Sequence, residues 1–249
     1  MIFTEKLKQN IRSFDTVQER LNCLKNLYDN ETMYLVSCGP SINKIDINIL
    51  KQKLKNKLVF CVKQAYDLMP DECDVHIMNT HNWKTYTYTS DPIAVYGVAL
   101  SYLEGQLNRI STEQTKCDIW IPVINPPYIT DSQATSYSKN FDNFYMLGNQ
   151  FETMWGKGIL YELALPLAIY MGVKKIVTIG WDIVSYSNEH EHYYNTPSEC
   201  TPQPGETLQL IESTSELYNW LSKNNIELQI VSDINPADQR IKRININEL

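Results

Sequence analysis

The spacing of apolar residues changes along the chain and separates expected helices from expected strands. Between residues 3 and 28 apolar side chains recur at helical spacing, which predicts one or two amphipathic helices. Later runs rich in β-branched and aromatic residues are followed by turn residues or by a new helical pattern, which predicts strands. We expect strands at 32–38, 58–62, 75–79, 94–100, 119–123, 173–179 and 226–231. We expect the later helices at 45–54, 65–69, 158–171 and 208–221.

The order of these elements predicts an α/β fold. Strands that alternate with helices are typical of a doubly wound, mostly parallel sheet with helices on both faces. We expect residues 1–30 to form an N-terminal helical extension and residues 31–249 to form one α/β domain. The polar and proline-containing segment 183–206 is expected to be a long loop or lid. The loops that follow the strands should then line one crevice.

Composition narrows the class of protein. The 249 residues carry a formal net charge of −7, which disfavours a nucleic-acid partner, because such proteins usually present a basic face. Charges interrupt the first residues and no apolar run approaches the roughly 20 residues of a membrane span, so neither a secretory signal nor a transmembrane segment is expected. The 6 cysteines form no CxxC pair, which favours reduced thiols in a cytoplasmic protein. Peripheral membrane contact and oligomeric state stay open.

The loop after the first expected strand is the first candidate site. It reads Ser-Cys-Gly-Pro-Ser, in which Gly39 lets the backbone approach a ligand and the Ser41 hydroxyl can donate to a phosphate at a helix start. Pro40 lies between them. The alternative is an ordinary turn in which Ser41 or Asn43 caps the next helix.

A second candidate follows the strand at 173–179. Gly180, Trp181 and Asp182 end this strand, and the Asp182 carboxylate could accept hydrogen bonds from sugar hydroxyls in the crevice. Asp182 could equally cap the segment that follows.

The third candidate lies in the expected lid. His190 and His192 could accept a proton from a hydroxyl nucleophile, and the hydroxyls of Tyr193 and Tyr194 could hold a leaving phosphate. The His-x-His pair could instead bind a metal, but no third ligand is suitably spaced. A solvated surface loop is the remaining interpretation.

Three further loops carry polar residues where a parallel sheet would place ligand contacts. Gln64 follows the second strand, Asn79 follows the third, and Lys157 with Gly158 opens the apolar helix. His76 lies inside an apolar strand, so we expect it to be a hydrogen-bonded structural residue and not a catalyst.

Several motifs occur in an order that resembles a known family. They are SCGPSINKID, VKQAY, HIMNTHN, GKGILYELALPLAIYMGVKKIVTIGWDI and NNIELQIVSD. In this order they resemble the bacterial sialyltransferases of glycosyltransferase family 42, together with motility accessory factors and archaeal pterin-diphosphokinase-like proteins. The resemblance covers roughly residues 32–232 and implies a single Rossmann-like (GT-A-like) domain.

The resemblance also implies a function. It implies metal-independent, inverting transfer of a sialic acid or related ulosonic acid from a CMP-sugar donor to a glycan, with no cofactor. A lid histidine would deprotonate the acceptor, and two tyrosines would hold the departing phosphate. The implied donor contacts are Gly39, Pro40, Ser41, Gln64, Asn79, Lys157, Gly158, Gly180, Trp181 and Asp182.

The chain departs from the family pattern at several of these positions. Cys38 and Gln64 each stand where the family has asparagine, and Lys157 stands where it has serine. The family's histidine before the last helix is absent, and Glu206 lies there instead. We therefore expect His192 to be the base, with His190 and Glu206 as alternatives. The other functions that we consider are a diphosphokinase using ATP with Mg²⁺, and a nonenzymatic nucleotide-binding protein.

Overall fold

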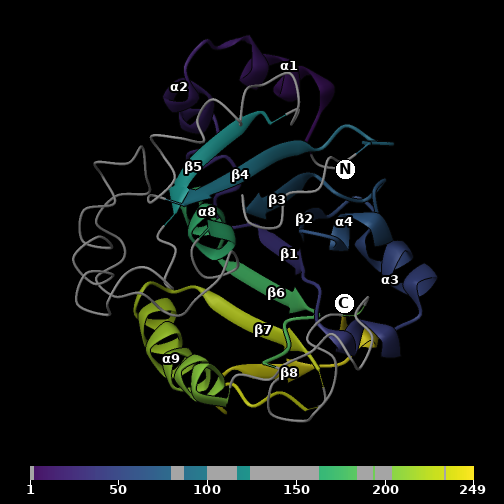
Figure 1. Cartoon of the computed structure of the whole chain (residues 1–249), viewed down its shortest axis with the longest axis vertical. Coiled ribbons are helices and arrows are strands. Elements are labelled where there is room, and N and C mark those ends of the chain that lie inside the picture. Colours follow the sequence, from purple (N-terminus) through teal and green to yellow (C-terminus); the bar gives the residue numbers. More distant parts are fainter. Residues whose placement is uncertain are drawn as a thin grey trace.

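A computed structural model describes residues 3–79, 87–99, 117–123, 163–183, 193, 204–232 and 234–249. These residues build an 8-stranded sheet in the order β5-β4-β3-β2-β1-β6-β7-β8 (Figure 1). Every neighbouring pair is parallel. The predicted α/β class is therefore confirmed.

The strands lie close to where the hydrophobic pattern predicts them. Their bounds are β1 Thr32–Val36, β2 Leu58–Val62, β3 Val75–Asn79, β4 Ile93–Ala99, β5 Ile119–Val123, β6 Lys175–Ile179, β7 Glu227–Val231 and β8 Lys242–Ile244. The edge strand β8 was not predicted. It contains only 3 residues, and two of them, Lys242 and Arg243, are charged, so no apolar run marks it.

The helices lie near their expected positions, except that the last long helix begins earlier than expected. Their bounds are α1 Glu5–Ser13, α2 Val17–Asn22, η1 Pro40–Lys44, α3 Ile47–Leu54, α4 Ala65–Leu68, α8 Leu165–Tyr170, α9 Pro204–Lys223 and η9 Ile246–Glu248. The N-terminal pattern forms two helices, because Thr16 begins the second one with a capping box to Glu19. The last long helix begins at Pro204, inside the segment expected to be the lid, because proline is tolerated in the first turn of a helix. Apart from Ile183, Tyr193 and 204–206, the expected lid lies outside the described residues.

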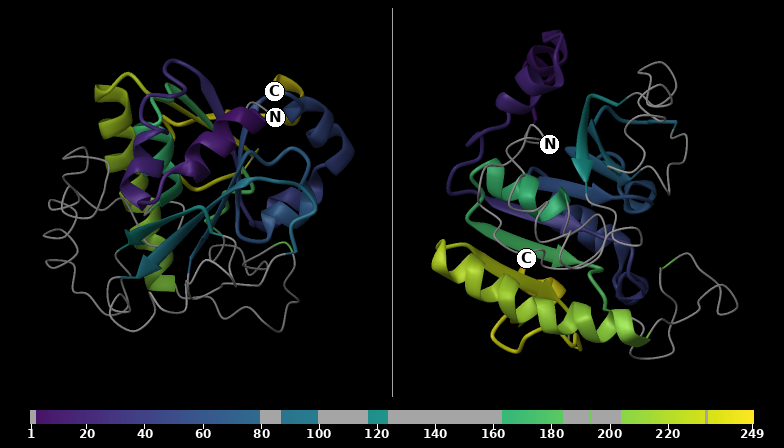
Figure 2. Two further views of the ribbon diagram at one scale, coloured as in Figure 1. Left: turned by 90° about the horizontal axis from the view of Figure 1, so that it is seen from above. Right: turned by 60° about the vertical axis from the view of Figure 1, so that its left-hand side comes forward.

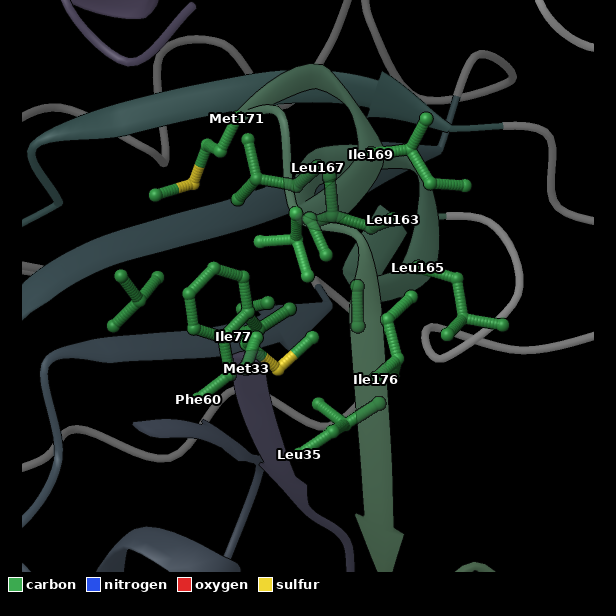
Figure 3. Close-up of a cluster of buried hydrophobic side chains, with 14 of the residues drawn as sticks. Met33, Leu35, Phe60, Ile77, Leu163, Leu165, Leu167, Ile169, Met171 and Ile176 are labelled. Carbon is green, nitrogen blue, oxygen red and sulfur yellow. The ribbon is translucent and has the colours of Figure 1, made fainter. Parts of the chain in front are cut away.

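Alternate residues of the strands pack into two apolar cores, one on each face of the sheet. Met33, Leu35 and Ile176 face the core that α8 and α9 cover, whereas Val36 and Ile179 face the core that α3 and α4 cover. Figure 2 shows these two pairs of helices on opposite sides of the sheet. All residues of α8 are buried, and Figure 3 shows the side chains of segment 163–171 above those of the central strands.

The N-terminal helices are attached at the amino ends of the strands. The Arg12 guanidinium donates to both carboxylate oxygens of Asp118, just before β5, at 2.6 and 3.2 Å. It also lies 2.8 Å from Asp91, just before β4. The backbone amide of Phe3 donates to the buried carboxylate of Asp74, just before β3. The N-terminal helices therefore lie at the rim opposite to the carboxyl ends of the strands, where the candidate site loops are.

No helix in the described ranges has the length and apolar character needed to cross a membrane.

Candidate functional site

The order of the strands places one crevice position in the middle of the sheet. From β1 the chain adds β2, β3, β4 and β5 in succession toward one edge, and it then returns to place β6 against the other side of β1. Figure 1 shows β1 between β2 and β6. In doubly wound sheets ligands bind outside the carboxyl ends of the strands at this switch point. The loops after β1 and β6 therefore occupy the favoured position.

These two loops are in direct contact. The Gly39 amide donates to the Gly180 carbonyl at 2.8 Å, and the Ser37 amide donates to the Ile179 carbonyl at 2.8 Å. A Cβ atom at Gly39 would lie 2.5 Å from the Gly180 carbonyl oxygen and 2.5 Å from Oδ2 of Asp182. Gly180 has φ +68°, and a Cβ there would lie 2.8 Å from the Ser37 oxygen. Both glycines are therefore required by the approach of one loop to the other.

Asp182 connects the two loops. Its Oδ2 accepts a hydrogen bond from the Ser41 amide at 2.6 Å. A carboxylate can accept several hydrogen bonds at once. Its neighbour Trp181 contributes its side chain to the apolar core and is only 5% exposed, while the Trp181 carbonyl accepts from Asn235.

The capping alternative for the first loop does not hold. The N-cap of η1 is Gly39, which makes no side-chain cap, and the N-cap of α3 is Asp46, whose carboxylate accepts from the Asn48 amide. Ser41 therefore caps neither helix.

Two buried polar atoms in this rim have no hydrogen-bond partner within the described ranges. They are Oγ of Ser41, after β1, and Oε1 of Gln64, after the adjacent strand β2. A buried polar group without a partner costs about 1–3 kcal/mol, so such groups are uncommon in folded proteins. The third atom of this kind, Oε2 of Glu72, lies in the turn before β3, at the other end of the sheet. Two of the three therefore belong to loops that the sequence marked as ligand contacts.

The loop after β2 has a strained backbone and buried support. Lys63 has φ 51°, in the left-handed region. Its amide donates to the Ile77 carbonyl, and its own carbonyl lies 2.8 Å from Nε2 of His76. The other ring nitrogen, Nδ1, lies 2.8 Å from the Tyr88 hydroxyl. The expectation of a hydrogen-bonded, buried His76 is therefore confirmed.

Tyr193 connects the expected lid to the loops after β1 and β2. Its amide donates to the Cys38 carbonyl at 2.7 Å, and its carbonyl accepts from the Asn43 side chain at 3.2 Å. Its hydroxyl donates to the Gln64 carbonyl at 2.8 Å. Tyr193 thus lies at the rim, with its hydroxyl on the backbone of the loop after β2.

Cys38 also joins the first two loops. Its thiol donates to the Val62 carbonyl at 3.1 Å, and its side chain is 3% exposed. Burial raises the pKa of this thiol to about 11, so it is protonated at neutral pH. The position where the sequence resemblance implies an asparagine therefore holds a buried thiol that ties β1 to the end of β2.

The remaining predicted residues are described in part or not at all. Asn79 is placed by its backbone alone, at the end of β3 opposite Gly97, and Glu206 by its backbone alone, in the first turn of α9. The others lie outside the described residues, namely Lys157, Gly158, His190, His192 and Tyr194.

The sequence did not predict the residues that hold the loops of the candidate site in place. No local sequence pattern marks the left-handed Lys63, the Tyr88 hydroxyl or the Asn43 contact, because each depends on contacts between separate elements.

Among the described side chains, no group of three or more His, Cys, Asp or Glu is placed to bind a metal. A hollow of about 450 Å³ lies between the ends of α8 and α9, on the amino-end rim, and contains none of the predicted site residues.

Comparisons with known proteins find similar folds. No family model and no curated protein sequence matches the chain. One similar solved structure is the sialyltransferase CstII from Campylobacter jejuni, in complex with the substrate analogue cytidine-5'-monophosphate. It is 13% identical with a TM-score of 0.46, and the match covers 87% of this chain and 85% of that chain.

A second similar solved structure is the MAf glycosyltransferase from Magnetospirillum magneticum AMB-1. It is 12% identical with a TM-score of 0.47, and the match covers 94% of this chain but only 38% of that chain. The two structures come from groups that the sequence motifs resemble, a sialyltransferase and a motility accessory factor.

Proposed function

We propose that the chain is a glycosyltransferase that binds a CMP-linked sialic acid or related ulosonic acid and transfers the sugar to a glycan acceptor. The observation that carries this proposal is the pair of buried, unpartnered polar atoms, Ser41 Oγ and Gln64 Oε1, in neighbouring loops beside the switch point. A ligand that supplies their missing hydrogen bonds would offset the cost of burying them. The resemblance of the sequence motifs suggests CMP as that ligand.

The polar groups of the rim match those of a nucleotide. The Ser41 hydroxyl can donate to a phosphate oxygen, whereas the Gln64 amide oxygen accepts only and suits a ribose hydroxyl or the cytosine amino group. A carboxylate can accept several hydrogen bonds, so the Asp182 side chain suits sugar hydroxyls as well as the Ser41 amide. A nucleotide lying across the loops after β1, β2 and β6 would reach all three side chains.

The proposed reaction is an inverting displacement. The acceptor hydroxyl oxygen forms a bond to the anomeric carbon while the bond from that carbon to the CMP phosphate oxygen breaks, and CMP leaves with the bonding electrons. His192 would take the hydroxyl proton, with Tyr193 and Tyr194 near the leaving phosphate. The contacts of Tyr193 with Cys38 and Gln64 support this choice of base, because His192 is its neighbour in the sequence.

The first experiment tests binding. Calorimetric titration of the full chain with CMP should show saturable binding, and Ser41→Ala should weaken it about tenfold. The same substitution removes an unpartnered buried hydroxyl, so the free energy of unfolding without ligand should stay unchanged or rise by about 1 kcal/mol. Ser37→Ala, in the same loop, is the matched control and should change neither quantity.

Two results would contradict the proposed site. One is absence of binding at millimolar CMP, and the other is a Ser41→Ala variant that binds CMP as tightly as the unmodified chain. Transfer is tested separately with a CMP-sugar donor, where His192→Ala should lower turnover and spare CMP affinity. CMP binding with neither transfer nor donor hydrolysis would favour a nonenzymatic nucleotide-binding protein, and release of AMP from ATP with a pterin alcohol would favour a diphosphokinase.

A further inference from the structure

The loop after β2 is held by side chains from two other parts of the chain. The Lys63 carbonyl lies 2.8 Å from Nε2 of His76 in β3. The next carbonyl, that of Gln64, accepts from the Tyr193 hydroxyl at 2.8 Å. Two consecutive backbone acceptors are thus satisfied by side chains that approach from different elements.

His76 is suited to fix this loop because its ring cannot turn freely. A carbonyl oxygen only accepts, so Nε2 carries the hydrogen and Nδ1 is left to pair with the Tyr88 hydroxyl at 2.8 Å. The ring packs against Tyr66 at 4.9 Å between centroids and is completely buried. Its hydrogen bond therefore has a fixed direction.

The bond acts on a strained residue. Lys63 has φ 51°, and a side chain in the left-handed region costs free energy that its surroundings must offset. Without the bond from His76 the backbone could relax toward an ordinary conformation. That change would rotate the next residue, Gln64.

With its backbone carbonyl satisfied, Gln64 keeps one buried acceptor without a partner in the described part of the chain, its side-chain Oε1. Resting on the proposed nucleotide site, we propose that His76 is a positioning residue, which holds the Lys63 carbonyl so that Gln64 presents its amide oxygen to a hydrogen-bond donor of the nucleoside. That donor is a ribose hydroxyl or the cytosine amino group. His76 itself touches no substrate.

The test compares two substitutions. His76→Leu removes the donor at similar size, whereas His76→Gln keeps an N–H group that can reach the Lys63 carbonyl. His76→Leu should weaken CMP and cytidine about tenfold alike, because the lost contact is to the nucleoside and not to the phosphate. His76→Gln should restore both affinities to within about threefold. Added to Gln64→Leu, the His76→Leu change should have no further effect.

A second measurement needs no ligand. In His76→Leu, hydrogen exchange of backbone amides in 63–68 should become faster while β6 and β7 keep their protection, and His76→Gln should exchange like the unmodified chain. If His76→Leu does not fold, Tyr88→Phe replaces it, since it removes the partner that orients the ring and should accelerate exchange in the same segment.

The outcomes separate this inference from the proposed function. If the unmodified chain binds neither CMP nor cytidine, the proposed function fails, and the exchange measurement still decides whether His76 holds the loop. If CMP binds but His76→Leu leaves affinity and exchange unchanged, the positioning role is overturned. Weakening of CMP without weakening of cytidine would also overturn it, because the phosphate would then be the affected group.

Discussion

Replacing Gly39 by alanine tests the closeness of the two central loops. The backbone of Gly39, with φ −65° and ψ 153°, is one that alanine adopts without strain. Any effect must therefore come from the added methyl group. That methyl would lie 2.5 Å from the Gly180 oxygen, 2.5 Å from Asp182 Oδ2 and 2.8 Å from Asp182 Cβ.

The expected cost follows from what has to move. The Gly180 oxygen is backbone and accepts from the Gly39 amide itself, so it cannot withdraw without loss of that bond. Rotation of Asp182 would break its bond to the Ser41 amide, a charge-assisted contact of about 1.5–3 kcal/mol. Overpacking by one methyl group alone costs about 1–3 kcal/mol. We expect Gly39→Ala to lower the free energy of unfolding by about 2–4 kcal/mol.

Chemical denaturation measures this free energy by linear extrapolation. Ser37→Ala is the control, because it lies in the same loop and adds no atom. The double variant Gly39→Ala with Asp182→Ala should lose less than the sum of the single variants, since the carboxylate that clashes is gone. A Gly39→Ala variant within about 0.5 kcal/mol of the unmodified chain would refute the close approach, since ordinary surface changes fall in that range.

Two further predictions concern the rest of the molecule. Arg12→Met should lower the free energy of unfolding by about 2 kcal/mol at pH 7, because the largely buried carboxylate of Asp118 loses its charged hydrogen-bond donor. Arg12 also holds the pKa of Asp91 below its usual range, so this part of the stabilisation is complete above about pH 4 and is lost as the pH falls through the lower folded value. The free energy of unfolding should be measured at pH 7 and at a pH below the lowered pKa of Asp91. The loss caused by Arg12→Met should be smaller in acid, and an equal loss at the two pH values would contradict the pairing with Asp91. Alkylation at pH 8 followed by mass spectrometry should modify Cys23 well before the buried thiols, and early loss of any buried thiol would refute its placement. The protected thiols are Cys38, Cys61, Cys73 and Cys117.

Much of the sheet could be predicted because each central strand is buried on both faces. The run Leu58–Val62 is wholly apolar and bounded by polar residues, so its bounds are visible in the sequence. Strand β8 lacks this signal, because it forms an edge of the sheet that the described residues build, and charged residues are tolerated at an edge. The start of α9 was predicted too late because Pro204 was taken as a loop residue. Proline disrupts a helix interior but is allowed in its first turn.

The candidate site was predictable in its position and not in its bonds. Alternation of strands and helices places the loops of Gly39 and Asp182 on one rim, and they do meet there. The sequence could not show that Asp182 binds the Ser41 amide, or that the Tyr193 hydroxyl lies on the Gln64 carbonyl. Such contacts depend on distances between elements that are far apart in the chain, which no local pattern encodes.

The central place of β1 has a consequence for synthesis on the ribosome. Thr32 of β1 pairs with Lys175 of β6, so one side of this strand stays open until much of the chain has been made. Contacts between such distant residues form late, because a long loop must first be closed. A nascent chain that ends before β6 would display an unpaired strand edge, which is where chains associate wrongly. The contacts between the loops after β1 and β6 would therefore be among the last to form.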